Sequence, residues 1–148
     1  PTMIDLLVKA GVKIVYVHQE AEPTINSTLL QIERLGAHPG LVVDPGVNFE
    51  TVETSLPVVD YVLVMTVNPG FAGQKLVPAT LPKIARLRAM LDSAGYPQVR
   101  IEVDGNVSFE NAVRMRQAGA DLFVAGTSSV FREGGINANM EKLLACIQ

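Results

Sequence analysis

The fold of this chain is decided by residues 62–74, which read VLVMTVNPGFAGQ. The apolar start of this stretch predicts a buried strand, because strands of a parallel sheet are covered on both faces. A glycine-containing loop follows, and a helical pattern covers residues 76–91. Ligands of α/β proteins bind at the C-terminal ends of such strands. Glycines there let main-chain N–H groups approach an anion, so the stretch predicts a phosphate site.

The same unit recurs along the chain, as a helix that ends near a glycine and a short apolar strand after it. The expected strands are residues 12–18, 40–44, 60–65, 98–104 and 120–125. The expected helices are residues 1–10, 24–35, 76–91, 108–115 (with Ser108 as N-cap) and 137–147. No linker interrupts this pattern, so we expect residues 1–148 to form a single α/β domain.

Two architectures fit strands and helices that alternate without hairpins. One is an open, doubly wound sheet, and the other is part of a (β/α)8 barrel. A complete barrel needs roughly 200 to 250 residues, whereas this chain has 148. The second architecture therefore implies an incomplete barrel.

The composition argues against several classes of protein. A net charge of −3 does not suit a nucleic-acid-binding surface. No apolar run reaches the roughly 18 to 20 residues of a membrane span. Cys146 is the only cysteine, which rules out an internal disulfide and favours a reducing, cytoplasmic location. Gly70 and Gly73 do not have the spacing of a GxGxxG or Walker nucleotide-binding loop.

Asp104 is the leading candidate for chemistry. It ends a predicted strand and is followed by Gly105 and Asn106. A carboxylate at this end of a strand faces the site of an α/β protein, where it binds a divalent cation or moves a proton. The alternative is a simple turn, since Asp-Gly is a common turn pair.

The loop after the last strand is a second candidate for phosphate binding. Gly126, Thr127 and Ser128 offer N–H groups and hydroxyls, and Val130 then suggests the start of a short helix. An ordinary helix N-cap explains the same residues.

Four other residues have weaker claims to function. His18 ends a strand, where packing or hydrogen bonding is favoured over metal ligation. His38 is expected at the surface of a loop, and Asp44 in a turn before Pro45 and Gly46. Cys146 lies on a helix with no base nearby in the sequence, which favours core packing over nucleophilic catalysis.

Three segments together resemble the ribulose-phosphate 3-epimerase family. Residues 64–74, 101–105 and 118–128 look like its signatures at strands six, seven and eight, in the family's order. The resemblance covers almost the whole chain. It implies a TIM-barrel enzyme, here without about the first three βα units, that inverts C3 of a small-molecule ketose phosphate.

The resemblance also implies roles for individual residues. The family uses two aspartates on opposite sides of the substrate and a divalent metal, most often zinc, with manganese, iron, cobalt or magnesium as alternatives. Asp104 would then be one acid/base and a metal ligand, and Met65 would lie over the reacting carbons. The residues implied to hold the substrate and its phosphate are Gly70, Phe71, Ala72, Gly73, Gly105, Asn106, Gly126, Thr127 and Ser128.

The chain also departs from the family pattern. Two histidines and the second aspartate belong to strands that would precede residue 1, so we expect this chain alone neither to hold the metal tightly nor to epimerise. A phosphosugar-binding or structural module without catalysis is the alternative function. Ala72 replaces a common glycine and resembles the branch that acts on allulose 6-phosphate, while ribulose 5-phosphate stays open as the substrate. The sheet edges of an incomplete barrel predict a homo-oligomer.

Overall fold

The computed structural model describes residues 2–21 and 24–148, in which five strands alternate with helices. In chain order the elements are α1 (Met3–Lys9), β1 (Ile14–His18), η1 (Gln19–Ala21), α2 (Ile25–Arg34), β2 (His38–Val43), α3 (Glu50–Glu53), η2 (Leu56–Val58), β3 (Tyr61–Met65), α4 (Thr80–Ser93), β4 (Arg100–Asp104), α5 (Phe109–Ala118), β5 (Leu122–Val124) and α6 (Ile136–Ile147). Pro1, predicted to start the first helix, lies outside the described residues. Within the described residues, no helix is both long and apolar enough to cross a bilayer.

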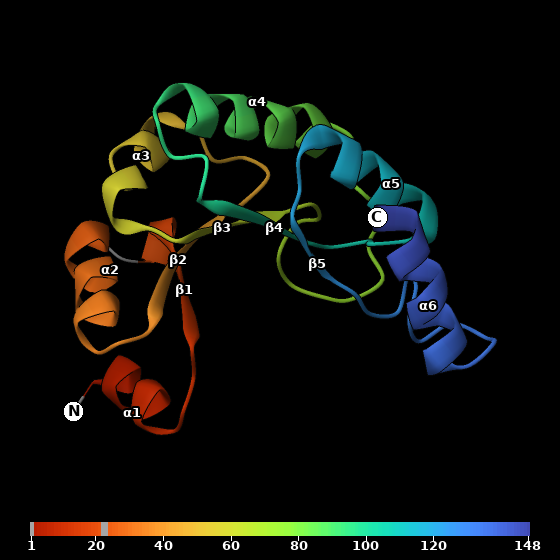
Figure 1. Cartoon of the computed structure of the whole chain (residues 1–148), viewed down its shortest axis with the longest axis horizontal. Helices are drawn as coiled ribbons and strands as arrows, with labels where there is room; N and C mark the ends of the chain where they lie inside the picture. The colour runs from red at the N-terminus through yellow and green to blue at the C-terminus, as the bar shows by residue number, and fades with distance from the viewer. Residues whose placement is uncertain (1, 22–23) are drawn as a thin grey trace.

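The five strands form one parallel sheet, which confirms the predicted α/β class. Their order is β1-β2-β3-β4-β5, the order of the chain itself. A doubly wound sheet reverses its strand order at a switch point, and no such reversal occurs here. Figure 1 shows α2 to α6 as an arc around one side of this sheet. This order and the helices on one side of the sheet fit the second of the two predicted architectures better than the first.

The face of the sheet that turns away from the helices is concave. Tyr16 on β1 and Glu102 on β4 are separated by two intervening strands, so a flat sheet would hold their backbones about 14 Å apart. The Tyr16 hydroxyl nevertheless donates a hydrogen bond to the Glu102 carboxylate. Its ring crosses β2 above Gly40, where a Cβ atom would lie only 2.3 Å from the ring. The glycine therefore makes room for a side-chain bond across the curve of the sheet.

The core lies between the other face of the sheet and the helices. Val62 and Val64 of β3 and Ile101 and Val103 of β4 are fully buried. They belong to one apolar cluster with residues of α2, α4, α5 and α6, namely Leu29, Ile32, Ile84, Leu87, Leu91, Met115 and Leu143. Neighbouring residues of a strand face opposite sides of the sheet. Met65, Glu102 and Asp104 alternate with these core residues, so they lie on the concave face.

Several predicted boundaries need correction. The helix expected at residues 76–91 begins only at Thr80, because Val77 donates its N–H to the carbonyl of Thr66 and carries the loop back onto β3. The helix expected near Val130 does not form; turns occupy this segment. His38 is exposed, as predicted, but it opens β2 instead of lying in a loop, and it bonds Asp60 at 2.7 Å. Ser108 is the N-cap of α5, as predicted.

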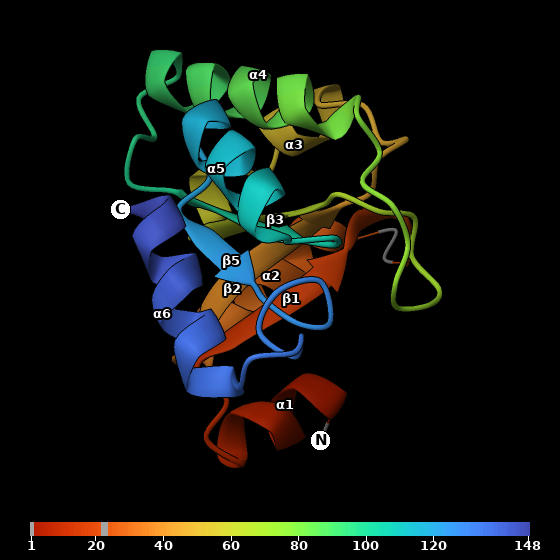
Figure 2. The same ribbon diagram turned by 90° about the vertical axis from the view of Figure 1, so that its right-hand side faces the viewer.

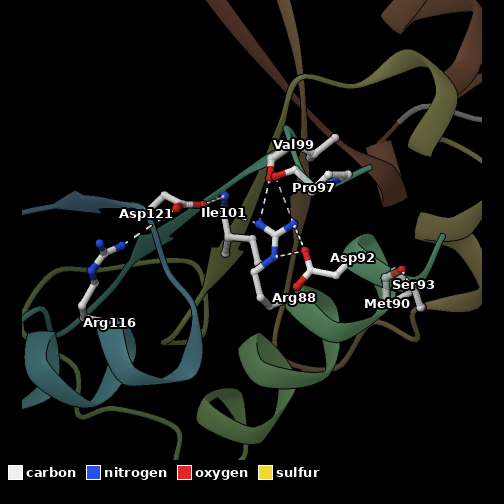
Figure 3. Close-up of polar contacts among 9 residues, drawn as sticks. All are labelled: Arg88, Met90, Asp92, Ser93, Pro97, Val99, Ile101, Arg116 and Asp121. Atoms are coloured by element: carbon white, nitrogen blue, oxygen red, sulfur yellow. Dashed lines mark hydrogen bonds and ion pairs between the residues drawn. The ribbon is translucent and has the colours of Figure 1, made fainter. Parts of the chain in front are cut away.

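Arg88 of α4 ties the N-terminal end of β4 to its surroundings (Figure 3). Its guanidinium donates to the carbonyl of Val99 at 3.0 Å and pairs with Asp92 at 2.8 Å. Asp121 lies 3.8 Å from the same guanidinium and accepts the N–H of Ile101 at 2.9 Å. These contacts lie at the N-terminal end of the strands. In βα folds of this kind, residues at that end stabilise the protein, whereas residues at the C-terminal end bind ligands.

Candidate active site

A cavity of about 460 Å³ opens at the C-terminal ends of β3, β4 and β5. This volume lies in the range typical of small-ligand sites. All the residues singled out from the sequence for catalysis or binding line it: Met65, Gly70, Phe71, Ala72, Gly73, Asp104, Gly105, Asn106, Gly126, Thr127 and Ser128. In Figure 2 the loops after these three strands lie at the same end of the sheet. The structure therefore brings residues from distant segments into one site.

Asp104 faces this cavity from the end of β4. Parallel pairing places it level with Met65 of β3 and Val124 of β5, so one row of side chains forms the floor of the site. Within the described part of the chain, no hydrogen bond or ion pair involves its carboxylate. Burial raises the pKa of this carboxyl above its ordinary value. A carboxylate with a raised pKa and no partner is well suited to accept a proton.

Thr66 fixes the main chain that carries Asp104. Its fully buried hydroxyl lies 2.9 Å from the carbonyl oxygen of Asp104 and 2.5 Å from that of Gly105. Its N–H also donates to the carbonyl of Asp104, at 2.8 Å. Gly105 has φ +123°, and a Cβ atom there would lie 2.6 Å from the side chain of Val67. Only glycine allows β3 and β4 to approach this closely beside the cavity.

Asn106 joins the three loops around the cavity. Its side-chain N–H groups donate to the carbonyl of Gln74 at 2.9 Å and to the hydroxyl of Ser128 at 3.4 Å. Its side-chain oxygen accepts from the amide of Asn111 at 2.7 Å. It adopts φ +49°, the left-handed conformation that asparagine tolerates better than most residues.

The loop after β3 is closed by its own side chain. The Gln74 amide donates to the carbonyl of Asn68 and, at 3.0 Å, to that of Phe71. Gly70 and Gly73 adopt φ values of +143° and +83°, which only glycine reaches without strain. Such a loop presents main-chain groups and few side chains to the cavity, which suits a phosphoryl group.

The described residues do not form a metal site by themselves. Among the side chains that the structure describes, no three of His, Cys, Asp or Glu gather closely enough to hold an ion. His18 lies 3.8 Å from Asp44, but neither residue lines the cavity. Asp104 thus offers a single carboxylate, and the full ligand set implied by the resemblance does not fit these residues.

Some residues at the site were not predicted from the sequence. Val67, Val107, Val124, Ala125 and Phe131 also line the cavity, although their sequence pattern is that of ordinary apolar residues. Thr66 and Asn111 do not line the cavity, but each bonds a residue that does. Thr66 interrupts an apolar run, and Asn111 lies next to Ala112 on the buried side of α5. A polar residue among buried apolar residues usually makes hydrogen bonds, so the sequence positions of Thr66 and Asn111 were an indication of such a role.

A family model and relatives identified by sequence point to one family. Residues 1–131 match the model of the ribulose-phosphate 3 epimerase family. The chain is 43% identical over 134 residues to the ribulose-phosphate 3-epimerase of Rhodobacter capsulatus, covering 90% of this chain and 57% of that protein. It is 42% identical over 125 residues to the ribulose-phosphate 3-epimerase of Bacillus subtilis (strain 168), covering 84% and 58%.

The chain spans somewhat more than half the length of these relatives. A crystal structure of 3-hexulose-6-phosphate synthase superposes with a TM-score of 0.64 at 19% identity, covering 98% of this chain and 67% of that one. At this identity the match shows a shared fold and nothing about activity.

Proposed function

Because the chain belongs to the ribulose-phosphate 3-epimerase family, we propose that the protein inverts C3 of a ketose phosphate. One observation carries this proposal. Asp104, a partly buried carboxylate with no hydrogen bond or ion pair to the residues that the structure describes, shares one cavity with two glycine-containing loops that suit a phosphoryl group.

The chemistry that Asp104 would perform is proton transfer at carbon. The C3 proton is acidic because it lies next to the C2 carbonyl, and the Asp104 carboxylate would accept it. The electron pair left on C3 is delocalised onto the C2 oxygen as an enediolate. Return of a proton to the opposite face of C3 inverts the centre. That step needs a second acid, and Asp104 is the only carboxylate among the described residues that line the cavity.

The loops would hold the phosphoryl end of the substrate. Main-chain N–H groups near Gly73, Asn106 and Gly126, with the hydroxyls of Thr127 and Ser128, are the proposed donors. The side chain of Asn106 is already engaged by Gln74, Ser128 and Asn111, so its direct contribution would come from the main chain. Binding energy gained at the phosphoryl group would hold C3 beside Asp104.

The substrate pair is proposed as ribulose 5-phosphate and xylulose 5-phosphate, or as allulose 6-phosphate and fructose 6-phosphate. The family supports the first pair. Ala72, in the place of a common glycine, favours the second. A direct comparison of kcat/KM for the two pairs decides between them.

A divalent cation, with zinc favoured, remains part of the proposal. Its chemistry would be stabilisation of the enediolate oxygens, and Asp104 is the residue of this chain that would contribute to holding it. The described residues supply no complete set of metal ligands. The proposed proton transfer by Asp104 therefore depends on its place in the cavity and on no metal ion. We also propose that the sheet is part of a (β/α)8 barrel and that the protein self-associates.

Binding of a phosphosugar without turnover is the second candidate. The single carboxylate in the described cavity lining favours it. The two candidates are separated by an assay of the complete gene product with each ketose phosphate, with and without added zinc. Interconversion of the C3 epimers supports the epimerase. Saturable binding of the ketose phosphate with no conversion under any metal condition supports the binding module.

A further inference from the structure

The residue that orients Asn106 lies outside the cavity. Asn111, on the first turn of α5, is buried and directs its side-chain amide toward Asn106. This amide donates to the side-chain oxygen of Asn106 at 2.7 Å and to its main-chain oxygen at 3.1 Å. The guanidinium of Arg114 donates to the other end of Asn111 at 3.3 Å. Donors and acceptors therefore alternate along the row from Arg114 to Asn106.

The hydrogen bond from Asn111 determines whether the oxygen or the nitrogen of the Asn106 side-chain amide faces the loops. With its oxygen engaged by Asn111, Asn106 has to present its N–H groups to the carbonyl of Gln74 and to the hydroxyl of Ser128. Gln74 belongs to the loop after β3, and Ser128 to the loop after β5. The Gln74 side chain in turn binds the carbonyls of Asn68 and Phe71 and closes the first of these loops.

We propose that Asn111 and Asn106 form an amide relay that holds the loops after β3 and β5 at a fixed separation, and that this separation sets the affinity of the cavity for a phosphoryl group. The inference rests on the proposed function for the identity of the substrate, but phosphate affinity can be measured without turnover. Asn111 and Asn106 are positioning residues here. The hydrogen bonds of the relay run to Gln74 and Ser128 and not to Asp104, so it should affect binding much more than proton transfer.

Two variants remove the relay in different ways. Asn106→Gly deletes the link to both loops, and glycine adopts the observed φ of +49° without strain, so folding is preserved. Asn111→Ala keeps the N–H that is bonded by the Ser108 cap and removes only the side chain that orients Asn106. Asn137→Ala is the matched control, because Asn137 lies in the first turn of α6 and is exposed.

The test measures KM and kcat for the ketose phosphate and the Kd for inorganic phosphate, in the complete gene product. We expect KM and the phosphate Kd to rise about fivefold to tenfold in each single variant, with kcat within about twofold of the parent. The double variant should match the single variants, since both substitutions break one relay. Asn137→Ala should behave as the parent.

Three results would overturn the proposal that the relay sets the phosphate affinity. The first is an unchanged KM and phosphate Kd in Asn106→Gly. The second is a double variant whose effect is the product of the single effects. The third is a parent protein that does not bind phosphate. If no ketose phosphate is turned over, the proposed function fails, and the phosphate Kd of the same variants still decides the relay.

Discussion

The hydroxyl of Thr66 and the main-chain oxygen of Asp104 lie 2.9 Å apart, within a buried junction between β3 and β4. The N–H of Thr66 donates to the same oxygen at 2.8 Å. The N–H of Thr66, and its one hydroxyl proton shared between the oxygens of Asp104 and Gly105, therefore hold the end of β4 from which the Asp104 side chain enters the cavity. A carboxylate that removes a proton from carbon must be placed with little freedom, and this junction limits its movement.

Removal of the Thr66 hydroxyl should loosen this junction. Thr66→Val keeps the shape of the side chain but leaves the carbonyl of Gly105 without its 2.5 Å partner. We expect the free energy of unfolding to fall by about 1–3 kcal/mol, measured by urea denaturation. Thr66→Ser retains the hydroxyl and should lose less. Equal stabilities of the valine variant and the parent would show that the hydroxyl does not secure the junction.

Asp104→Asn should abolish most of the epimerase activity. The amide has nearly the same shape as the carboxylate but cannot accept the C3 proton, so kcat should fall about 10²- to 10⁴-fold. KM should change little, because the proposed phosphate donors are untouched. Glu141→Gln makes the same chemical change at an exposed position of α6 and serves as the control. A variant at position 104 with parental kcat would remove Asp104 from the mechanism.

Stability should depend on pH through Asp104. Burial raises the pKa of this carboxyl in the folded state. Its stabilising contribution is therefore present in the protonated form at low pH and is lost as the pH rises through the folded-state pKa. The unfolding free energy of Asp104→Asn, relative to the parent, should increase between about pH 3 and pH 7 in metal-free buffer. A difference that is constant or decreases over this range would contradict the desolvation of Asp104.

Arg88 should affect stability without affecting the site. Arg88→Met removes the donors to Val99 and Asp92 at the far end of the sheet, and we expect a loss of about 1–3 kcal/mol in urea denaturation. KM should stay at the parental value at temperatures where the variant is folded. Arg34→Met, on an exposed position of α2, is the control. A change in KM caused by Arg88→Met alone would show that the two ends of the sheet are coupled.

The sequence predicted the strands and the cavity lining because both follow from local patterns. Short apolar runs mark the strands, and each predicted site residue comes at or after the end of one. The α4 boundary was wrong because Val77 bonds to Thr66, a long-range contact that no helical pattern reveals. The amide relay was missed for the same reason, since it joins residues from three loops and α5 only after folding.

Solvent exchange at C3 reports on whether Asp104 transfers the proton. The complete gene product is incubated with ribulose 5-phosphate in D2O, and the C3 proton is followed by NMR. We expect deuterium to replace this proton in the parent protein and Asp104→Asn to slow the exchange at least about 100-fold. Exchange at the parental rate in Asp104→Asn, or epimerisation that leaves the C3 proton in place, would contradict proton transfer by Asp104.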